Sequence, residues 1–330
     1  MTILAVNLNA AIDKRYDIDD IQIGCVQRVK HVAASAGGKG LNVARAARIA
    51  GQAVIVTGFV GGFAGEFVTS QATGLEVRDE FIRVDGESRT CINIIDAAGR
   101  STELLEPGVT VKPCDLEALL NRVRSLLPEV DVVTMSGSAP QGCPDDVYAS
   151  LVRAARKSSV PVILDTSGNL LVEGLKAKPD VFKPNREELS VLVGEDLPDL
   201  DAVVSAARKV AAKGPHWVVV SLGADGAVAV SRDRAVHAGS LHVPVNNPVG
   251  CGDVLVAGLA SGIARGLDVP SALPFAVQAS AASVAHTETG QFDYGLARSL
   301  ERDLAITDID VPADSTVIPG IGPSRGEANS

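Results

Sequence analysis

The sequence is poor in cysteine and has no arrangement of cysteines that would build a metal site or a disulfide framework. Its five cysteines form no CxxC pair and no regular spacing, and its five histidines do not complete a ligand set with them. It also lacks any hydrophobic run of the roughly 20 residues that cross a bilayer, and its N-terminus has neither the basic segment nor the long apolar core of a signal peptide. We therefore expect a soluble, cytoplasmic protein without structural zinc or membrane contact.

Positive charge is scarce as well. The formal net charge is -10, and no cluster of lysine and arginine stands out along the chain. Because nucleic-acid binding requires a basic surface that neutralises phosphates, this balance argues against a general nucleic-acid binder and leaves room only for a local basic pocket. With 330 residues, 46% of them hydrophobic, the chain is long enough for one large domain, or for one domain with a small satellite.

Two common nucleotide-binding fingerprints are missing. The GxxxxGK[ST] spacing of a Walker A loop does not occur around Lys39, and Gly250-Cys251-Gly252 does not extend to GxGxxG because position 255 is Leu255. What is present, in segment 34–51, is a set of glycines around Lys39, followed by Asn42 in the first turn of an expected helix. Glycines let the backbone approach a polar ligand closely, so this segment predicts a ligand-binding loop. The alternative is a tight strand-to-helix turn with a solvated lysine.

From about residue 110 onward, short hydrophobic runs alternate with segments of helical periodicity. The runs that predict strands are 130–138, 160–168, 180–185 and 216–223. The segments with apolar residues at three- and four-residue spacing, which predict helices, are 115–127, 144–159 and 199–214. This alternation predicts an α/β fold with a mostly parallel sheet covered by helices on both faces, in which ligands bind beyond the carboxyl ends of the strands.

The N-terminal third differs, because its strand-like segments follow one another without helices between them. Residues 12–34 and 80–106 predict a small antiparallel sheet inserted into the α/β body, which would consist of residues 1–11, 35–79 and 107–312. So few strands cannot form a core alone, and we expect this sheet to act as a lid and to pair with a second copy of the chain in a homodimer. The small, polar segment 313–330 predicts a frayed C-terminal tail.

Asp253 stands at the start of an apolar segment, directly after the turn Gly250-Cys251-Gly252. A helix N-terminus attracts anions, because its first backbone N–H groups are unpaired and its dipole is positive there. The carboxylate can therefore cap the helix, or it can be a base that faces an incoming phosphate. The local pattern alone leaves both interpretations open.

A third polar segment covers residues 183–189. Pro184 helps to end the preceding strand, which leaves Asn185, Glu187 and Glu188 at the start of the next helix. Acids in a first helical turn need no function, because the helix dipole favours them, but an Asn and a Glu at a strand end can also hold waters around Mg²⁺. In a further segment, Ser221, Gly223 and Gly226 predict a strand, a turn and a second strand. This pattern is also typical of an ordinary hairpin without a binding role.

Taken in this order, the motifs resemble those of the PfkB branch of the ribokinase-like carbohydrate kinases over nearly the whole chain. The segments that carry the resemblance are AGGKGLNVAR (36–45), MSGSAPQG (135–142), LDTSG (164–168), KPNREEL (183–189), VSLGADGA (220–227) and NPVGCGD (247–253). Within this branch the sequence is most similar to the tagatose-6-phosphate kinases, followed by the 1-phosphofructokinases. That similarity rests on NLNAAID (7–13), GESRTCINIID (86–96), TELLEPG (102–108) and Asn247-Pro248-Val249.

The resemblance implies a three-layer α/β/α fold and ATP-dependent transfer of a phosphoryl group to a sugar hydroxyl, with Asp253 as the base beside the turn Gly250-Cys251-Gly252. The residues implied to hold the sugar or to line its cleft are Asp13, Gly38, Lys39, Asn42, Arg89, Ser136 and Ser138, with Arg28 on the lid as a further cation. The residues implied to contact ATP are Lys183, Asn185, Ser221, Gly223, Gly226 and Asn247, and Glu188 would organise Mg²⁺ through water.

The expected acceptor is a ketohexose phosphate, either tagatose 6-phosphate or a fructose 1- or 6-phosphate, which becomes a hexose bisphosphate. Such an acceptor needs cations near its own phosphate, and Lys39, Arg89 and Arg28 are the candidates. Two alternatives stay open: a kinase of an unphosphorylated sugar or nucleoside in the same fold, and a non-catalytic sugar-phosphate-binding regulator, against which the intact Asp253 argues. Where the resembled kinases carry Ala or Ser between the two glycines, Cys251 places a thiol beside the reacting phosphate.

Overall fold

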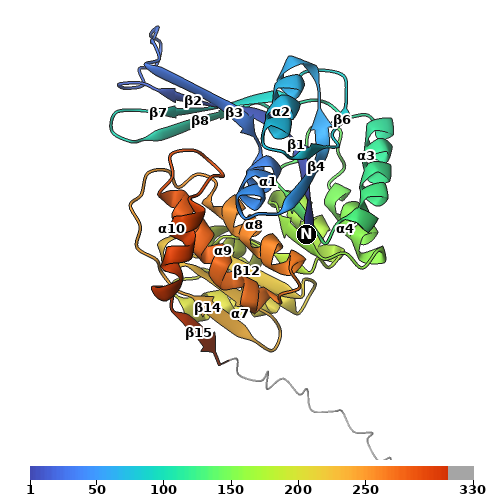
Figure 1. The fold of residues 1–330 in the computed structure, drawn as a ribbon, viewed down its shortest axis with the longest axis vertical. Coiled ribbons are helices and arrows are strands. Elements are labelled where there is room, and N and C mark those ends of the chain that lie inside the picture. Colours follow the sequence, from blue (N-terminus) through green and yellow to red (C-terminus); the bar gives the residue numbers. More distant parts are fainter. Residues whose placement is uncertain (311–330) are drawn as a thin grey trace, which may run out of the picture.

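Two β-sheets organise residues 1–310, the part of the chain that the computed structural model describes (Figure 1). The tail expected at 313–330, and the last two residues of the expected body, lie outside these described residues. The strands of the large sheet are β1 (Thr2–Asn9), β4 (Ala53–Val60), β5 (Arg78–Asp79), β6 (Ile82–Arg83), β9 (Val132–Ser136), β10 (Val162–Asp165), β11 (Val181–Phe182), β12 (Trp217–Ser221), β13 (Ala227–Val230), β14 (Ala235–Ala238) and β15 (Ile306–Ile309).

The large sheet is parallel from one edge to β12 and antiparallel beyond it. Its strand order is β15-β14-β13-β12-β11-β10-β9-β1-β4-β5, with β6 paired to β4. The pairs between β12 and β15 are antiparallel and the others are parallel. The predicted mostly parallel sheet is confirmed, and the four strands expected after residue 110 are β9 to β12.

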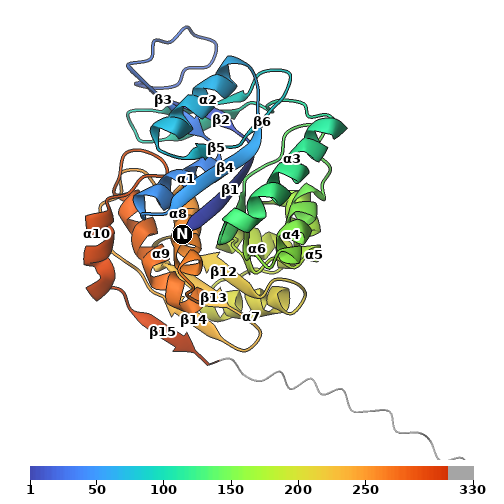
Figure 2. The ribbon, with the colours of Figure 1, turned by 45° about the vertical axis from the view of Figure 1, so that its right-hand side comes forward.

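Helices cover both faces of the large sheet (Figures 1 and 2). On one face lie α1 (Lys39–Ile49), α2 (Gly62–Gly74), α8 (Cys251–Ala264), α9 (Val269–Val284) and α10 (Tyr294–Ser299). On the other lie α3 (Pro113–Leu126), α4 (Val147–Lys157), α5 (Gly168–Lys176), α6 (Arg186–Val193) and α7 (Leu200–Ala211). Side chains of β1 alternate between the two cores, Ile3 and Ala5 joining the first and Leu4 and Val6 the second. The three predicted helices are α3, α4 and α7.

The second sheet has four strands and projects from the body beyond the carboxyl end of β1 (Figure 1). Its order is β3 (His31–Gly37), β2 (Ala11–Asp17), β7 (Arg89–Ile95) and β8 (Ser101–Leu105). It is mixed and not purely antiparallel as expected, because the two β-hairpin pairs join through parallel pairing of β2 with β7. We call these four strands the small sheet.

The expected boundaries of the small sheet are partly wrong. Ile82–Arg83 forms β6 and pairs with β4 of the large sheet, so the segment beginning at residue 80 belongs to the body until β7 starts at Arg89. At the other boundary, β3 continues to Gly37 and pairs there with Ala11, so residues 35–37 belong to the small sheet. Backbone pairing, which extends past the change in composition, determines these limits. Among residues 1–310, no helix is long and apolar enough to span a membrane.

Candidate active site

A cleft of about 1200 Å³ opens where the carboxyl ends of the central strands face the small sheet. Its walls come from the ends of β10 to β12, the first turns of α1 and α8, and the inner surface of the small sheet. The predicted site residues that line it are Asp13, Gly38, Lys39, Asn42, Arg89, Lys183, Asn185, Glu188, Ser221, Gly223, Gly226, Asn247, Gly250, Cys251, Gly252 and Asp253. Residues spread over 240 positions of the sequence thus meet in one cavity, at the place where parallel α/β sheets bind ligands.

Three predicted site residues lie elsewhere. Ser136 is fully buried at the end of β9, and its hydroxyl has no hydrogen-bond partner. Ser138 is exposed and accepts a hydrogen bond from Asn9 Nδ2 at 3.4 Å. Arg28 is exposed in the connection between β2 and β3 and does not line the cleft. The strand pleat directs Ser136 into the protein interior, and a local motif does not reveal that direction.

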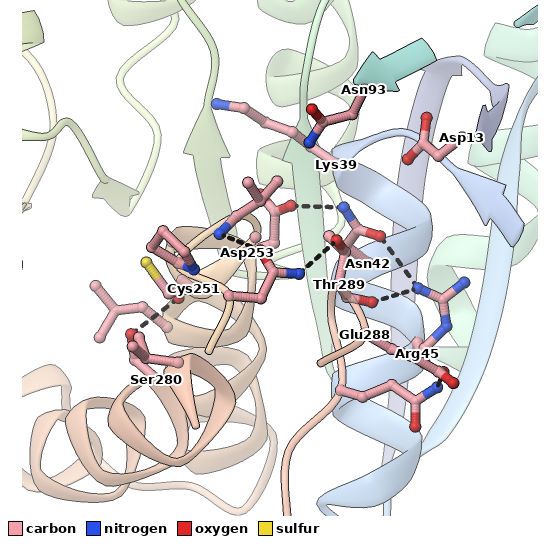
Figure 3. Close-up of a pocket in the computed structure, with 18 of the residues that line it drawn as sticks. Asp13, Lys39, Asn42, Arg45, Asn93, Cys251, Asp253, Ser280, Glu288 and Thr289 are labelled. Atoms are coloured by element: carbon pink, nitrogen blue, oxygen red, sulfur yellow. Dashed lines mark hydrogen bonds between the residues drawn. The ribbon is translucent and has the colours of Figure 1, made fainter. Parts of the chain in front are cut away.

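Asp253 lies in the first turn of α8 and does not cap that helix. The N-cap is Gly250, which has a left-handed φ of 83°, and no side chain caps the helix end. The Asp253 carboxylate instead accepts a hydrogen bond from Asn42 Nδ2, at 2.9 Å (Figure 3). Asn42 belongs to α1, so this bond joins residues 211 positions apart. The capping interpretation of Asp253 is therefore wrong.

The environment of Asp253 favours its protonated form. Burial and the nearby Asp165 raise the pKa of Asp253 to about 7, against the opposing effects of Lys39, Asn42 and Lys183. Its side chain is buried, with the whole residue 5% exposed. A carboxylate with a pKa near neutrality can accept a proton at physiological pH and release it again, which suits a general base.

Two lysines converge on Asp165, a residue that the sequence analysis assigned no role. Asp165 ends β10 and is 1% exposed, and its Oδ1 lies 3.3 Å from Lys39 Nζ and 3.6 Å from Lys183 Nζ. Its other oxygen, Oδ2, has no hydrogen-bond partner among residues 1–310. Although burial lowers it, the net pKa of Lys39 is raised, because Asp165, Asp253 and Glu188 all favour the ammonium. Both lysines are therefore held beside Asp253, with their charge directed at the cleft. The motif LDTSG was the only sequence signal for Asp165.

The small sheet contributes a second polar group to the cleft. Asp13 of β2 is half-buried, and burial raises its pKa while the Gly38 backbone, Arg89 and Arg45 oppose that rise. Gly37 allows this placement, because a Cβ at position 37 would lie 2.0 Å from Asp13 Cγ. Arg89 of β7 donates its Nε–H to the Asn9 carbonyl at 3.1 Å, which fixes the guanidinium at the base of the small sheet. Asn93 and Glu103 line the same end of the cleft.

The other end of the cleft combines polar turns with an apolar wall. Asn185 and Glu188 form a capping box at the start of α6, with Asn185 N to Glu188 Oε2 at 2.9 Å and Glu188 N to Asn185 Oδ1 at 2.7 Å. Gly223 and Gly226 lie in the short turn between β12 and β13, both with positive φ. Asn247 Nδ2 donates to the Thr287 carbonyl at 3.1 Å. The apolar wall consists of Leu241, Val243, Val277, Ala281 and Val284.

Cys251 lines the cleft beside Asp253, but its thiol is not activated. Burial, followed by the negative charge of Asp253, raises the pKa of Cys251, and the effects of Lys183 and of the helix backbone do not reverse this. Its backbone carbonyl accepts a hydrogen bond from Ser280 Oγ at 2.9 Å, which ties the turn to α9 (Figure 3). The thiol therefore remains protonated near neutral pH.

Comparison with solved structures defines the class of protein. Arabidopsis thaliana ribokinase superimposes with a TM-score of 0.75, at 22% identity over 91% of this chain and 98% of that chain, so the fold is that of the ribokinase-like enzymes. Escherichia coli phosphofructokinase-2 gives a TM-score of 0.85 at 25% identity, over 92% of this chain and 98% of that chain. A provisionally assigned 1-phosphofructokinase from Thermotoga maritima gives 0.82 at 27% identity, over 94% of this chain and 100% of that chain.

The family follows from a direct match. The model of the pfkB family carbohydrate kinases matches residues 6–293, and the chain belongs to this family. It is a carbohydrate kinase whose substrates are a sugar and ATP.

Proposed function

We propose that this carbohydrate kinase transfers the γ-phosphoryl group of ATP to a hydroxyl of a ketohexose phosphate, with Asp253 as the base. The observation that carries the proposal is the buried Asp253 carboxyl, whose pKa is about 7, at the start of α8 between Lys39 and Lys183. The acceptor is tagatose 6-phosphate, fructose 1-phosphate or fructose 6-phosphate, and the product is a hexose bisphosphate. The phosphofructokinase neighbours support an acceptor that already carries phosphate.

The reaction requires positioning and charge more than covalent help from the protein. As the acceptor oxygen forms its bond to the γ-phosphorus, its proton passes to the Asp253 carboxylate and the bond from phosphorus to the ADP oxygen breaks. Negative charge on the transferring group is stabilised by Lys39 and Lys183 and by the positive end of α8 at Gly250-Cys251-Gly252. The glycine turn allows this close approach, because Gly250 has a left-handed backbone that L-residues rarely adopt.

In this proposal the two substrates bind at opposite ends of the cleft. Asp13 and Arg89, at the small sheet, orient the acceptor, with Arg89 pairing with its existing phosphate. Lys39 was expected to share that role; in this proposal it acts on the group in transfer instead, which its position near Asp165 and Asp253 supports. ATP occupies the opposite end, against the turns of Lys183, Asn185, Ser221, Gly223, Gly226 and Asn247.

Magnesium fits this site only as an ion carried by the nucleotide. Within residues 1–310 no group of three or more His, Cys, Asp or Glu side chains could hold a metal, and one oxygen of Glu188 is engaged in the capping box. Mg²⁺ prefers phosphate oxygens, waters and one or two carboxylates, so Glu188 would hold it through water. When bound, the ion neutralises charge on the phosphates.

The test is a coupled assay of ADP formation across free and phosphorylated ketohexoses, with wild type and Asp253→Asn. We expect phosphorylated ketohexoses to be preferred, and turnover to fall by roughly 10²- to 10⁴-fold in Asp253→Asn while ATP binding persists. Near-normal turnover in Asp253→Asn would refute the assignment of Asp253 as the base. A preference for an unphosphorylated sugar or a nucleoside would support the alternative kinase, and transfer to no acceptor would support a regulator.

We also propose a homodimer through the small sheet. Val32 and Leu104, which lie on the same face of this sheet and do not line the cleft, are 54% and 55% exposed, which is unusual for large apolar side chains grouped on one sheet. Leu104→Glu should convert a dimer into monomers in light scattering. Val191→Glu is the matched control, because Val191 is also an exposed apolar side chain, at 84%, but lies on α6 and not on the small sheet. A wild-type monomer at assay concentration would refute the dimer.

A further inference from the structure

Arg45 is a buried cation next to the proposed base but not in contact with it. It belongs to α1, is 5% exposed, and makes three hydrogen bonds to oxygens around it (Figure 3). One guanidinium nitrogen, NH1, donates to Asn42 Oδ1 at 3.2 Å and to the Thr289 carbonyl at 2.9 Å. The other, NH2, donates to the Ala36 carbonyl at 2.7 Å. No sequence pattern indicated a role for Arg45.

The bond from Arg45 determines which end of the Asn42 amide faces Asp253. A guanidinium has only donors, so the atom of Asn42 that meets Arg45 must be its carbonyl oxygen. The NH₂ group of the same amide then points the other way, where it donates to Asp253 Oδ2 at 2.9 Å. In the opposite orientation, the amide oxygen would face the carboxylate and its NH₂ would face a cation. Arg45, Asn42 and Asp253 thus form a chain of two directed hydrogen bonds, which we call the relay.

The loop after α9 holds Arg45 in place. Thr289 supplies its carbonyl to Arg45, and the next residue, Gly290, approaches so closely that a Cβ would lie 2.9 Å from Asn42 Cα and 3.2 Å from Arg45 NH1. Gly290 has a φ of +70°, which fits a glycine. Arg45 is therefore held from both sides, by the end of β3 at Ala36 and by this loop. A side chain so constrained can hold the Asn42 amide in a single orientation.

We infer that Arg45 is a positioning residue that orients the Asn42 amide and thereby keeps a hydrogen-bond donor on the Asp253 carboxylate. Its importance for turnover rests on the proposed role of Asp253 as the base. Without Arg45 the amide can rotate, and the ionised form of Asp253 loses a donor that stabilises it. The expected consequence is a higher pKa for Asp253 and a smaller fraction of active base at neutral pH.

Other charged groups act on the same residues and must be separated from this effect. Asp253 is faced by Asp165, Lys39, Lys183 and the Cys251 thiol, which stay in place when Arg45 is changed. Arg45 itself is faced by Asp13 and Glu288. Because Arg45 lowers the pKa of Asp13, its loss will also raise that pKa. The test therefore has to follow Asp253 individually.

The experiment is a ¹³C NMR titration of aspartate carboxyls in the full-length protein, with the Asp253 resonance assigned from its absence in Asp253→Asn. We expect Arg45→Met to raise the pKa of Asp253 by about one unit, the size of one lost hydrogen bond to a charged group. Arg45→Lys keeps a donor and the buried charge, so it should fold and give a smaller shift in the same direction. No shift in either variant would overturn the inference.

Two further variants distinguish positioning from other effects. Arg48 lies one turn along α1 and also donates to backbone carbonyls, of Leu75 and Gln52, so Arg48→Met is a matched control that should leave the pKa of Asp253 unchanged. In an Asn42→Ala background, adding Arg45→Met should produce no additional shift, because the relay is already broken. An additional shift would show that Arg45 acts by its own charge and would overturn the relay.

Kinetics separate this inference from the proposed function. If Asp253 is the base, the acidic limb of the kcat/KM profile should move with the NMR pKa, so that Arg45→Met loses about tenfold at pH 6 and recovers at high pH. If the pKa of Asp253 measured by NMR shifts but the acidic limb of the kcat/KM profile does not, Asp253 is not the base, and the inferred role of Arg45 is retained. An unshifted NMR pKa would reject the relay, whatever the profile.

Discussion

Asp253→Asn should stabilise the protein while it removes activity. The wild-type carboxyl is buried, and its pKa in the folded protein is about 7, against the ordinary value of 3.8. A group whose pKa is raised by folding binds its proton more tightly in the folded state, so folding becomes less favourable as pH rises from the unfolded pKa to the folded one. The asparagine variant has the same shape and no charge, and so escapes this cost.

The size of the effect follows from the two pKa values. One unit corresponds to about 1.4 kcal/mol. Relative to low pH, the raised pKa therefore destabilises the fold by about 2 kcal/mol at pH 5, where the buried carboxyl must hold a proton, and by about 4 kcal/mol at pH 8, where it is ionised. The free energy of unfolding of Asp253→Asn should therefore exceed that of wild type by an amount that grows by roughly 2 to 3 kcal/mol over this range. The expected increase in Tm is several degrees at pH 8, at roughly 2 °C for each kcal/mol in a chain of this size.

Urea and thermal unfolding between pH 5 and pH 8 measure this difference. The matched control is Asp268→Asn at the N-cap of α9, where hydrogen bonds from the Ser271 side chain and from the Ser271 N–H, the latter at 2.9 Å, lower the pKa of the carboxyl. The Asp268 carboxylate stabilises the fold above its unfolded pKa, so its contribution is constant from pH 5 to 8 and the control difference should not change. A constant difference for Asp253→Asn would mean that Asp253 does not titrate near neutrality, and would remove the electrostatic argument for a base.

Three further predictions concern binding, packing and thiol reactivity. Arg89→Ala should raise KM for the sugar phosphate far more than KM for ATP in initial-rate assays, and equal changes would refute its assignment. Gly258→Val should lower the midpoint of urea unfolding, because the Cβ of the valine would lie 2.4 Å from a backbone atom of α9. Gly74→Ala should leave the midpoint unchanged, because there is open space around Gly74. In peptide mapping after alkylation, the exposed Cys25 should be labelled well before Cys251, because burial raises the pKa of the Cys251 thiol. Faster labelling of Cys251 than of Cys25 would contradict this effect of burial.

Much of the fold was predictable because hydrophobic periodicity is local. The alternation after residue 110 predicts β9 to β12 and the helices α3, α4 and α7, since a buried parallel strand and an amphipathic helix each need their own pattern. Most of the residues that the ordered motifs predicted likewise line the cleft, because the carboxyl ends of parallel strands meet at one edge of a sheet. The limits of the small sheet were less predictable, because backbone pairing of β3 and β6 does not depend on composition.

The electrostatics of the cleft depended on contacts between distant parts of the chain. The pairing of Asp165 with Lys39 spans 126 residues, and the bond from Asn42 to Asp253 spans 211. No local pattern encodes such distances, so the local pattern left Asp253 between a helix cap and a base until the family resemblance favoured the base, and it gave Asp165 and Arg45 no role. Burial is the main cause that raises the pKa of Asp253 to about 7, because a carboxylate removed from water loses its hydration. The depth of burial does not depend on the neighbours of Asp253 in the sequence, and only the packed structure determines it.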